Sequence, residues 1–377
     1  MHKIFYVDPM SYGNLASYDY YLLSNINDGN IFFFGNVKYD EKELGGNISF
    51  YPIFKYSDYK TKFAKFLSYT TSVFRLLWFL IKEKPQIIHI QWFKIHFVDL
   101  ILCRILKLRN IKLVYTVHNI LPHDSGISQV AVYQKYYDYA DVLLVHTKTT
   151  KLRLATKFNL DKNKIFIIPH GLIKINVNTE KVTKLVNYYC SLKQLKGKII
   201  FSSLGVQSTY KGCDLIAELW SKESFLFQNE KIVLLIMGKN KNVNYDDLKD
   251  IKNVFIVDRF ITNEEFLAAI KITNLLFMPY REISQSGLLM TAIGEKTPVL
   301  VSSAGELEAP LKIENIGWSM GIANYDNFKL TMLQILNDKN HLINIKNDVT
   351  AWNNLCEHYS WTEIGKQTAD IYKKILD

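Results

Sequence analysis

The stretch "PYREISQSGLLMTAIGEKTPVLVSS", residues 279–303, contains a short apolar helix between two strand-like runs. The run 275–278 precedes it, the predicted helix covers 288–293, and the second run begins at Pro298. A strand, a helix and a second strand in quick succession are typical of a βαβ unit, whose strands pair in parallel. The stretch therefore predicts an α/β protein built on parallel sheets.

The start of this predicted helix has the residues of an anion site. Ser284 and Ser286 offer hydroxyl groups, and Gly287 has no side chain to block the approach of a ligand. The first N–H groups of a helix have no partner within the helix, so the turn suits a phosphate. Serine also caps helices routinely, and capping alone explains the same residues.

Alternating strand and helix patterns continue along the chain and predict two Rossmann-like domains that face each other across a cleft. We predict the first domain over 1–173 and the second over 195–357, with a polar stretch and a possible helix between them. Dinucleotide binding is not indicated, because no Gly-x-Gly-x-x-Gly follows the first strand. The expected strands are 3–7, 31–34, 87–90, 112–117, 142–146, 164–168, 198–203, 231–237, 254–257, 275–278 and 299–301.

The composition is that of a globular protein with a basic surface. The chain has 377 residues, of which 48% are hydrophobic and 22% charged, and a formal net charge of +10. Such a charge suits nucleic acid, an anionic membrane or phosphorylated small molecules, but no nucleic-acid motif is present. The four cysteines are scattered, and no signal-peptide pattern precedes the first strand. We therefore expect a cytoplasmic protein with reduced thiols, no metal and no nucleic-acid partner.

The segment 60–84 is predicted as one long helix with an apolar stripe among basic residues. A helix packed against the core explains the stripe. The surrounding lysines and aromatic residues also suit contact with an anionic membrane surface. The stripe consists of Phe63, Phe66, Leu67, Phe74, Leu77, Trp78 and Ile81.

Several short motifs, taken in order, resemble those of a known family over nearly the whole chain. They are "SYGN" at 11–14, "IIHIQW" at 87–92, "YTVHN" at 115–119, "IIPHG" at 167–171, "YKG" at 210–212 and "IMGK" at 236–239. Together with the stretch 279–303 they resemble the GT-B glycosyltransferases of group 1, or family 4. The resemblance implies two Rossmann-like domains, and a C-terminal helix at about 358–377 that crosses back to the first domain.

The resemblance also implies that the second domain binds a nucleotide-sugar. Its diphosphate would lie at the turn of Ser284, Ser286 and Gly287, with the positive end of a helix behind it. Lys211 would neutralise the same diphosphate as a point charge. The nucleotide-sugar is a substrate, so no cofactor is expected.

Three further residues complete the expected donor site. Gly13 would let the first loop approach the donor closely. Glu282 would bond a sugar hydroxyl, and Arg281 would pair with phosphate or with Glu282. Surface ion pairs explain Arg281 and Glu282 equally well.

The chain departs from the family pattern at two places. Many members have two glutamates eight positions apart around this turn, whereas the second position here falls near Thr291. The family's arginine between the glycine and the lysine of the phosphate loop is absent from "GVQSTYKG", which leaves Lys211 alone. Neither the donor identity nor the stereochemistry can therefore be transferred from the family.

For the chemistry itself we expect His118 and Asp124 to contribute. His118 ends a predicted strand, where ligands of parallel sheets bind, and the family has a histidine here. Its alternative role is to hold the loop in place. Asp124, with His123 beside it, is the candidate base if the enzyme inverts, although an aspartate before Ser-Gly is often only a turn former.

These features favour a transferase that moves a sugar from a nucleoside diphosphate onto a lipid-linked oligosaccharide, as assembly of a bacterial cell-surface polysaccharide requires. The enzyme would act at the inner face of the cytoplasmic membrane. A nucleotide-sugar epimerase or hydrolase of the same fold is the enzymatic alternative. A two-lobed sugar-binding protein is the alternative without catalysis.

Overall fold

The computed structural model describes residues 2–40, 44–121, 127–173, 175, 177–192, 195–229, 231–283 and 286–376. The chain divides into two compact units. Unit 1 comprises Met1–Gly171 together with Tyr359–Asp377, and unit 2 comprises Leu172–His358. The sequence predicts these borders at 173, 195 and 357.

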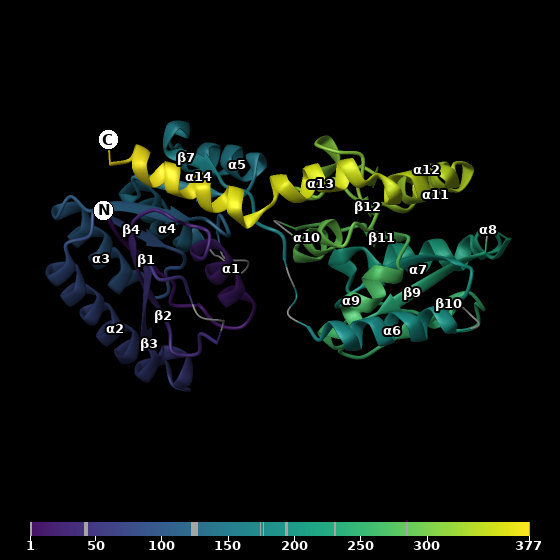
Figure 1. Cartoon of the computed structure of the whole chain (residues 1–377), viewed down its shortest axis with the longest axis horizontal. Helices are drawn as coiled ribbons and strands as arrows, with labels where there is room; N and C mark the ends of the chain where they lie inside the picture. The colour runs from purple at the N-terminus through teal and green to yellow at the C-terminus, as the bar shows by residue number, and fades with distance from the viewer. Residues whose placement is uncertain are drawn as a thin grey trace. The chain divides into compact units, whose positions relative to one another are not determined.

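Unit 1 is a seven-stranded parallel sheet with the order β3-β2-β1-β4-β5-β6-β7 and helices on both faces (Figure 1). Its strands are β1 (Lys3–Val7), β2 (Asn30–Asn36), β3 (Ile48–Phe54), β4 (Ile87–Ile90), β5 (Lys112–Thr116), β6 (Val142–Val145) and β7 (Ile165–Ile167). Its helices are α1 (Asn14–Leu23), α2 (Lys62–Glu83), α3 (His96–Leu108), α4 (Ile127–Tyr139), α5 (Lys148–Phe158) and α14 (Trp361–Lys374).

Unit 2 is a six-stranded sheet, also parallel, with the order β10-β9-β8-β11-β12-β13. Its strands are β8 (Ile199–Leu204), β9 (Ile232–Met237), β10 (Val254–Val257), β11 (Leu275–Met278), β12 (Val299–Val301) and β13 (Gly317–Ser319). Its helices are α6 (Thr179–Ser191), α7 (Cys213–Lys222), α8 (Ser224–Asn229), α9 (Asn263–Ile272), α10 (Gly287–Gly294), α11 (Tyr325–Asn337), α12 (Lys339–Asn347) and α13 (Val349–His358).

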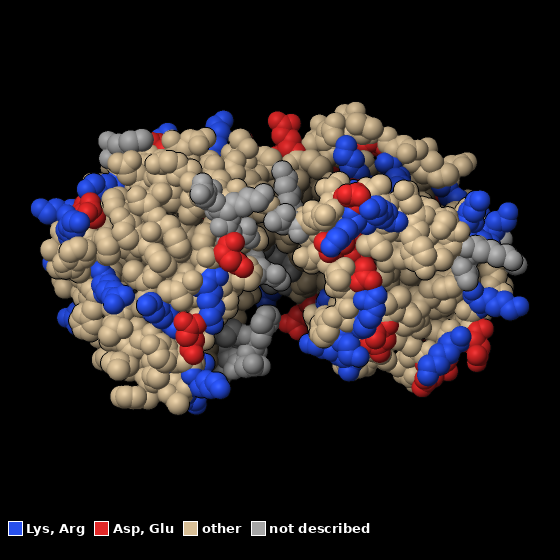
Figure 2. Space-filling model, turned by 60° about the horizontal axis from the view of Figure 1, so that its bottom comes forward, with Lys and Arg blue, Asp and Glu red and all other residues tan. Residues whose placement is uncertain are grey.

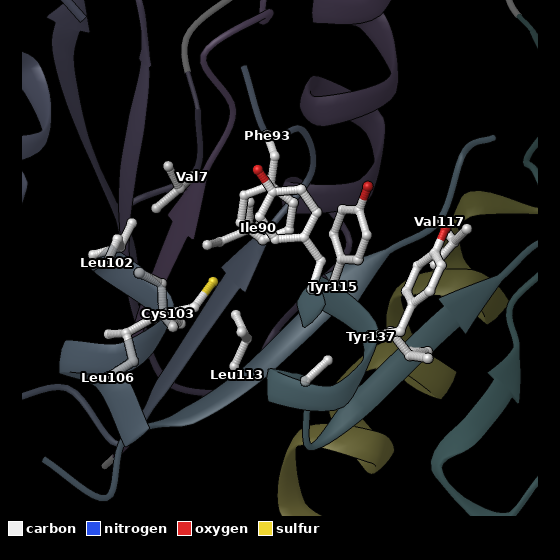
Figure 3. Packing of buried hydrophobic residues seen from close by; sticks show 14 of the residues in the cluster. Val7, Ile90, Phe93, Leu102, Cys103, Leu106, Leu113, Tyr115, Val117 and Tyr137 are labelled. Atoms are coloured by element: carbon white, nitrogen blue, oxygen red, sulfur yellow. The ribbon is translucent and has the colours of Figure 1, made fainter. Parts of the chain in front are cut away.

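The β1 strand shows how the sheet of unit 1 is buried on both faces. Phe5 and Val7 point into the cluster that α2, α3 and α4 cover, while Ile4 and Tyr6 point into the cluster that α1 and α14 cover. Successive side chains of a strand alternate between faces, so every residue of such a strand can be apolar. Figure 3 shows the first of these clusters, in which strand residues pack against Leu102, Cys103 and Leu106 of α3.

Two strands were missing from the sequence prediction, and both lie at sheet edges. They are β3, which pairs only with β2, and β13, which pairs only with β12. The β3 strand contains Pro52 and is mostly half-exposed, and β13 has three residues. Edge strands need neither a continuous apolar run nor a full set of backbone donors, so they leave a weak sequence signal.

The α2 helix occupies nearly the predicted range but turns the opposite face to the core. Its buried residues are Tyr69, Ser72, Val73, Leu76 and Leu80. The prediction that the aromatic stripe packs inside is therefore wrong, apart from the half-buried Leu77, which packs against the core cluster. The exposed fractions are 75% for Phe63, 41% for Phe66, 53% for Leu67, 65% for Phe74, 56% for Trp78 and 56% for Ile81.

The last helix, α14, belongs to unit 1 and packs against segments from the start of the chain, which are far from it in sequence. Trp361 and Tyr372 are buried in the same cluster as Ile4 and Tyr6. The backbone of Gly365 comes so near that an added Cβ would lie 2.2 Å from the carbonyl oxygen of Asn25. The helix therefore needs a residue without a side chain at this crossing.

We expect Gly365→Ala to lower the free energy of unfolding of the chain by about 1–3 kcal/mol, because the added methyl group overpacks this contact. Urea unfolding followed by circular dichroism measures the change. Gly294→Ala is the matched control, since a Cβ at this helical glycine meets nothing within 4 Å. A Gly365 variant as stable as this control would contradict the close contact of α14.

Candidate functional site

In unit 2 the predicted donor residues gather where the strand order reverses. The order runs outward from β8 through β9 on one side and from β11 through β12 on the other. Ligands of such sheets bind at the carboxyl ends of the strands at this point. Lys211 follows β8, and Arg281 follows β11. The fold therefore brings together two segments that lie far apart in the sequence.

The loop after β8 lies directly on the loop after β11. Gly212 has a φ of 69°, and an added Cβ would lie 2.0 Å from the carbonyl oxygen of Pro279. Next to this contact the N–H of Arg281 donates to the carbonyl of Tyr210 over 2.8 Å. The glycine of "YKG" is thus required both by its backbone angle and by lack of space.

The side chain of Arg281 fixes the same loop from outside. Its guanidinium donates to both carboxylate oxygens of Asp214, each over 2.7 Å, and to the carbonyl of Thr209. The predicted pairing of Arg281 with Glu282 is not formed: Arg281 binds Asp214, and Glu282 is exposed. In this arrangement Arg281 holds the loop that carries Lys211.

Lys211 is the cation that this loop presents. Its ammonium group lies 5.7 Å from the ring centre of Tyr280 and 6.0 Å from that of Tyr210. No carboxylate among the described residues pairs with it, and burial lowers its pKa. A half-buried cation without a counter-charge is costly, so the position favours binding of an anion.

The start of α10 is formed as the sequence predicts, at Ser286 and Gly287. The hydroxyl of Ser286 accepts from the N–H of Leu289 over 3.3 Å, so this serine does cap the helix. A Cβ on Gly287 would lie 2.9 Å from Cδ1 of Ile173. Capping leaves the first N–H groups of the helix available. Ser284 lies outside the described residues.

Ser208 is a polar group of the unit 2 site that the sequence analysis missed. It lies three residues before Lys211, is 2% exposed, and its hydroxyl has no hydrogen-bond partner among the described residues. A buried hydroxyl without a partner is uncommon. Nothing in "GVQSTYKG" marks it, because a serine in such a loop is an ordinary turn residue.

In unit 1 the predicted residue Gly13 precedes α1. Its φ of 57° and ψ of −138° are strained for any residue with a side chain, while an added Cβ would meet nothing within 4 Å. The backbone angles, rather than crowding, therefore require the glycine. The open space above it is compatible with the predicted approach of a ligand.

His118 lies at the end of β5, in a chain of hydrogen-bonded side chains. Its Nε2 lies 2.9 Å from Oε1 of Gln91, and its Nδ1 lies 3.2 Å from Nε2 of His146. The amide of Gln91 also contacts His89 over 2.9 Å, and Nδ1 of His89 lies 2.5 Å from the Tyr372 hydroxyl. The chain thus joins the ends of β4, β5 and β6 to α14.

Burial keeps these histidines neutral. It lowers the pKa of His89 and of His146 to about 3, and it lowers the pKa of His118 well below the usual value. His146 donates from Nδ1 to the carbonyl of Ile168 over 3.0 Å, so its Nε2 must accept a proton from Nδ1 of His118. A neutral His118 then has a bare Nε2 that faces Oε1 of Gln91, so a hydrogen bond between them requires the Gln91 amide to turn its nitrogen toward this ring.

Both ring nitrogens of His118 are therefore occupied within unit 1, and its ring stacks on Trp92 with centroids 4.7 Å apart. This is the geometry of a residue that holds its loop. A contact from His118 to a substrate through Nε2 requires Gln91 to move away. Asp124 and His123 lie outside the described residues.

The other group that the sequence analysis missed is a pair of buried carboxyls behind the first loop. Asp8 directly follows β1, is 2% exposed, and burial raises its pKa to about 6. Asp19 is fully buried and accepts from the Tyr6 hydroxyl over 2.6 Å. The signal that could have revealed Asp8 is its place directly after a buried strand at the reversal between β1 and β4.

Among the residues that the structure describes, no group of His, Cys, Asp and Glu side chains could hold a metal ion. Over the same residues, no helix combines the length and the apolar character that crossing a membrane would need.

Comparison with known proteins agrees with this geometry. Residues 42–173 match the family model described as Glycosyltransferase Family 4. The chain has the GT-B fold and resembles the group 1 glycosyltransferases. An uncharacterized glycosyltransferase of Methanocaldococcus jannaschii is 22% identical over 311 residues, which are 78% of this chain and 77% of the relative.

Solved structures extend the likeness over both units. Sucrose-phosphate synthase of Thermosynechococcus elongatus has a TM-score of 0.72 at 14% identity, over 100% of this chain and 99% of that one. HepE of Anabaena in complex with UDP has a TM-score of 0.68 at 11% identity, over 99% and 100%. At such identities the likeness shows the GT-B fold, as predicted.

We expect His89, His118 and His146 to remain neutral at about pH 5.5, where a free imidazole is charged. Nitrogen chemical shifts in NMR, followed from about pH 8 down to about pH 5.5, measure this. Because folding depresses these three pKa values, their contribution to stability is complete above about pH 6.5 and decreases as the pH falls further. A His118 signal that reaches the shifts of a charged imidazolium at about pH 5.5 would contradict the assigned network.

Proposed function

We propose that the chain is a glycosyltransferase that transfers a sugar, of hexose type, from a nucleoside diphosphate-sugar. The observation that carries the proposal is the unpaired Lys211, held at the strand reversal of unit 2 by the contact of Gly212 with Pro279. A cation beside a helix start suits the departing diphosphate, whose charge must be stabilised during transfer. The matched family and the relative named above support transfer over epimerisation or sugar binding.

For the donor site we keep the residues proposed from the sequence, with one change of role. Lys211, Ser284, Ser286 and Gly287 would bind the diphosphate, and Glu282 a sugar hydroxyl. Arg281 would act on the donor through the loop that it holds, because its guanidinium is already bound to Asp214. HepE of Anabaena, which has a similar fold, was solved in complex with UDP. This supports a nucleoside diphosphate as the ligand of this chain.

For unit 1 we propose that Gly13 lies beside the donor and that His118 assists transfer as a neutral imidazole. The neutral form follows from its burial. Asp124 remains the proposed base for an inverting reaction. No metal or other cofactor is part of this proposal.

The acceptor that we propose is a lipid-linked saccharide at the inner face of the cytoplasmic membrane, used in cell-surface polysaccharide assembly. The exposed aromatic face of α2 supports it, because apolar faces of this extent mark binding surfaces. On the face of unit 1 that Figure 2 shows, Lys and Arg side chains are spread with few acidic ones between them. Such a surface suits an anionic membrane.

The function is tested by incubating the protein with a panel of nucleotide-sugars, with and without lipid-linked saccharides. We expect release of a nucleoside diphosphate and a sugar-extended lipid only when donor and acceptor are both present. Release of the diphosphate without acceptor would indicate hydrolysis, and a changed sugar still attached to its nucleotide would indicate an epimerase. Binding of a nucleotide-sugar or saccharide without formation of any product would indicate a two-lobed sugar-binding protein.

We expect Lys211→Ala to weaken binding of the nucleoside diphosphate by about 1.5–3 kcal/mol, the range for a hydrogen bond to a charged group. Isothermal titration calorimetry with the diphosphate found in the panel gives the affinity. Lys198→Ala is the matched control. This exposed lysine lies beside the amino end of β8, whereas Lys211 follows the carboxyl end of the same strand. Equal affinities of the two variants would refute the assignment of Lys211.

A further inference from the structure

A cavity of about 350 Å³ lies between α2 and the edge strand β3 of unit 1. One wall is the helix ridge that contains Ala64, Leu67, Ser68, Thr71 and Arg75, which recur at helical spacing. The other wall comes from the edge strand β3 and the segment after it. This second wall contains Ile53, Lys55 and Tyr59.

Both cations of the cavity lack a partner. Lys55 and Arg75 are exposed, and neither forms an ion pair or side-chain hydrogen bond with any described residue. No carboxylate lines the cavity. The nearby acids in sequence are already engaged, since Asp58 pairs with Lys38 over 2.9 Å and Glu83 pairs with Lys3 over 2.9 Å.

Hydroxyl groups line the same cavity as the two cations. Ser68 lines it, and its hydroxyl makes no hydrogen bond with the described residues. Thr71 donates to the carbonyl of Ser68 over 2.8 Å, which leaves its oxygen free to accept. A guanidinium, an ammonium and a free hydroxyl together supply the donors that a phosphate group needs.

The surroundings of the cavity are apolar and exposed. Leu67 lines the cavity and belongs to the aromatic face of α2, which includes Phe63 and Phe74. Elsewhere on unit 1, the helix α3 exposes Phe97 at 71% and Leu108 at 76%. The chain from 55 to 84 has seven basic residues and two acidic ones. Charge and apolar surface thus both complement an anionic lipid bilayer.

We propose that this cavity binds the phosphate of an anionic phospholipid headgroup while the aromatic face of α2 enters the bilayer interface. Lys55 and Arg75 hold the phosphate, and Ser68 donates a hydrogen bond to it. The proposal rests on the membrane contact put forward above and specifies its ligand. It distinguishes a built headgroup site from a diffuse attraction between basic residues and a charged surface.

The test compares phosphatidylcholine vesicles of equal surface charge that carry either phosphatidylglycerol or cholesteryl hemisuccinate, whose charge is a carboxylate. Diffuse electrostatics depends only on the surface charge and predicts equal binding. We expect the full-length wild type to bind the phosphatidylglycerol vesicles roughly tenfold more tightly in co-sedimentation, since charge-assisted bonds to phosphate add to the attraction. Equal binding to both vesicles would overturn the proposal.

Two double variants test whether the preference for phosphatidylglycerol arises from the cavity. Lys55→Gln with Arg75→Gln changes the cavity, whereas Lys62→Gln with Lys82→Gln removes the same charge from α2 outside it. Both should bind all anionic vesicles more weakly than the wild type. Only the cavity variant should lose its preference for phosphatidylglycerol. Retained preference in the cavity variant, or equal loss in the control variant, would refute the site.

Two further measurements are needed. One distinguishes a lipid headgroup from free inorganic phosphate as the ligand, and the other distinguishes loss of the headgroup site from loss of transferase activity. Monomeric dihexanoyl phosphatidylglycerol should shift the NMR signal of the Arg75 side chain, and inorganic phosphate at the same concentration should shift it less. An equal response to inorganic phosphate would contradict recognition of a lipid headgroup. Transfer to a water-soluble acceptor should be unchanged in the cavity variant, so loss of the headgroup site and failure of the proposed transferase give different results.

Discussion

Parallel pairing of β1 with β4, and of β8 with β11, is the constraint on which the candidate sites depend. Parallel strands need long crossovers. Each crossover returns the chain to the same end of the sheet, so that all carboxyl ends of the strands lie together. The carboxyl ends of β8 and β11 therefore meet although Lys211 and Arg281 are far apart in the sequence. The contact of Gly212 with Pro279 shows how closely the two loops must then pack.

The two units use buried polar groups in different ways. In unit 1 the ring nitrogens of His89, His118 and His146 are all engaged by protein groups, which favours a rigid, neutral network. Among the described residues of unit 2, the cation of Lys211 has no carboxylate partner and the hydroxyl of Ser208 has no hydrogen-bond partner. Unsatisfied groups at the end of a strand are those that a ligand can complete, whereas satisfied ones support the fold.

Much of the fold could be predicted from the sequence because buried parallel strands are continuous apolar runs. The interior strands of both sheets and the edge strands β7 and β10 were predicted on this basis. The edge strands β3 and β13 were not, because β3 contains Pro52 and is mostly half-exposed, and β13 has only three residues. Within the candidate site, Lys211, Ser286 and Gly287 follow from local motifs. The Arg281–Asp214 pair and the roles of His89 and Gln91 could not be predicted, because each depends on segments that meet only in the folded chain.

The α2 helix shows which of its features the sequence determines and which are decided only by the tertiary structure. The sequence by itself predicted one long helix over 60–84, close to the observed 62–83, because apolar residues recur there at helical spacing. It did not determine which side faces the core, because both sides are apolar. The smaller side, with Val73, Leu76 and Leu80, fits against the sheet, and the aromatic side remains exposed. That choice is made by packing, because only one of two apolar faces can occupy the space above a given sheet.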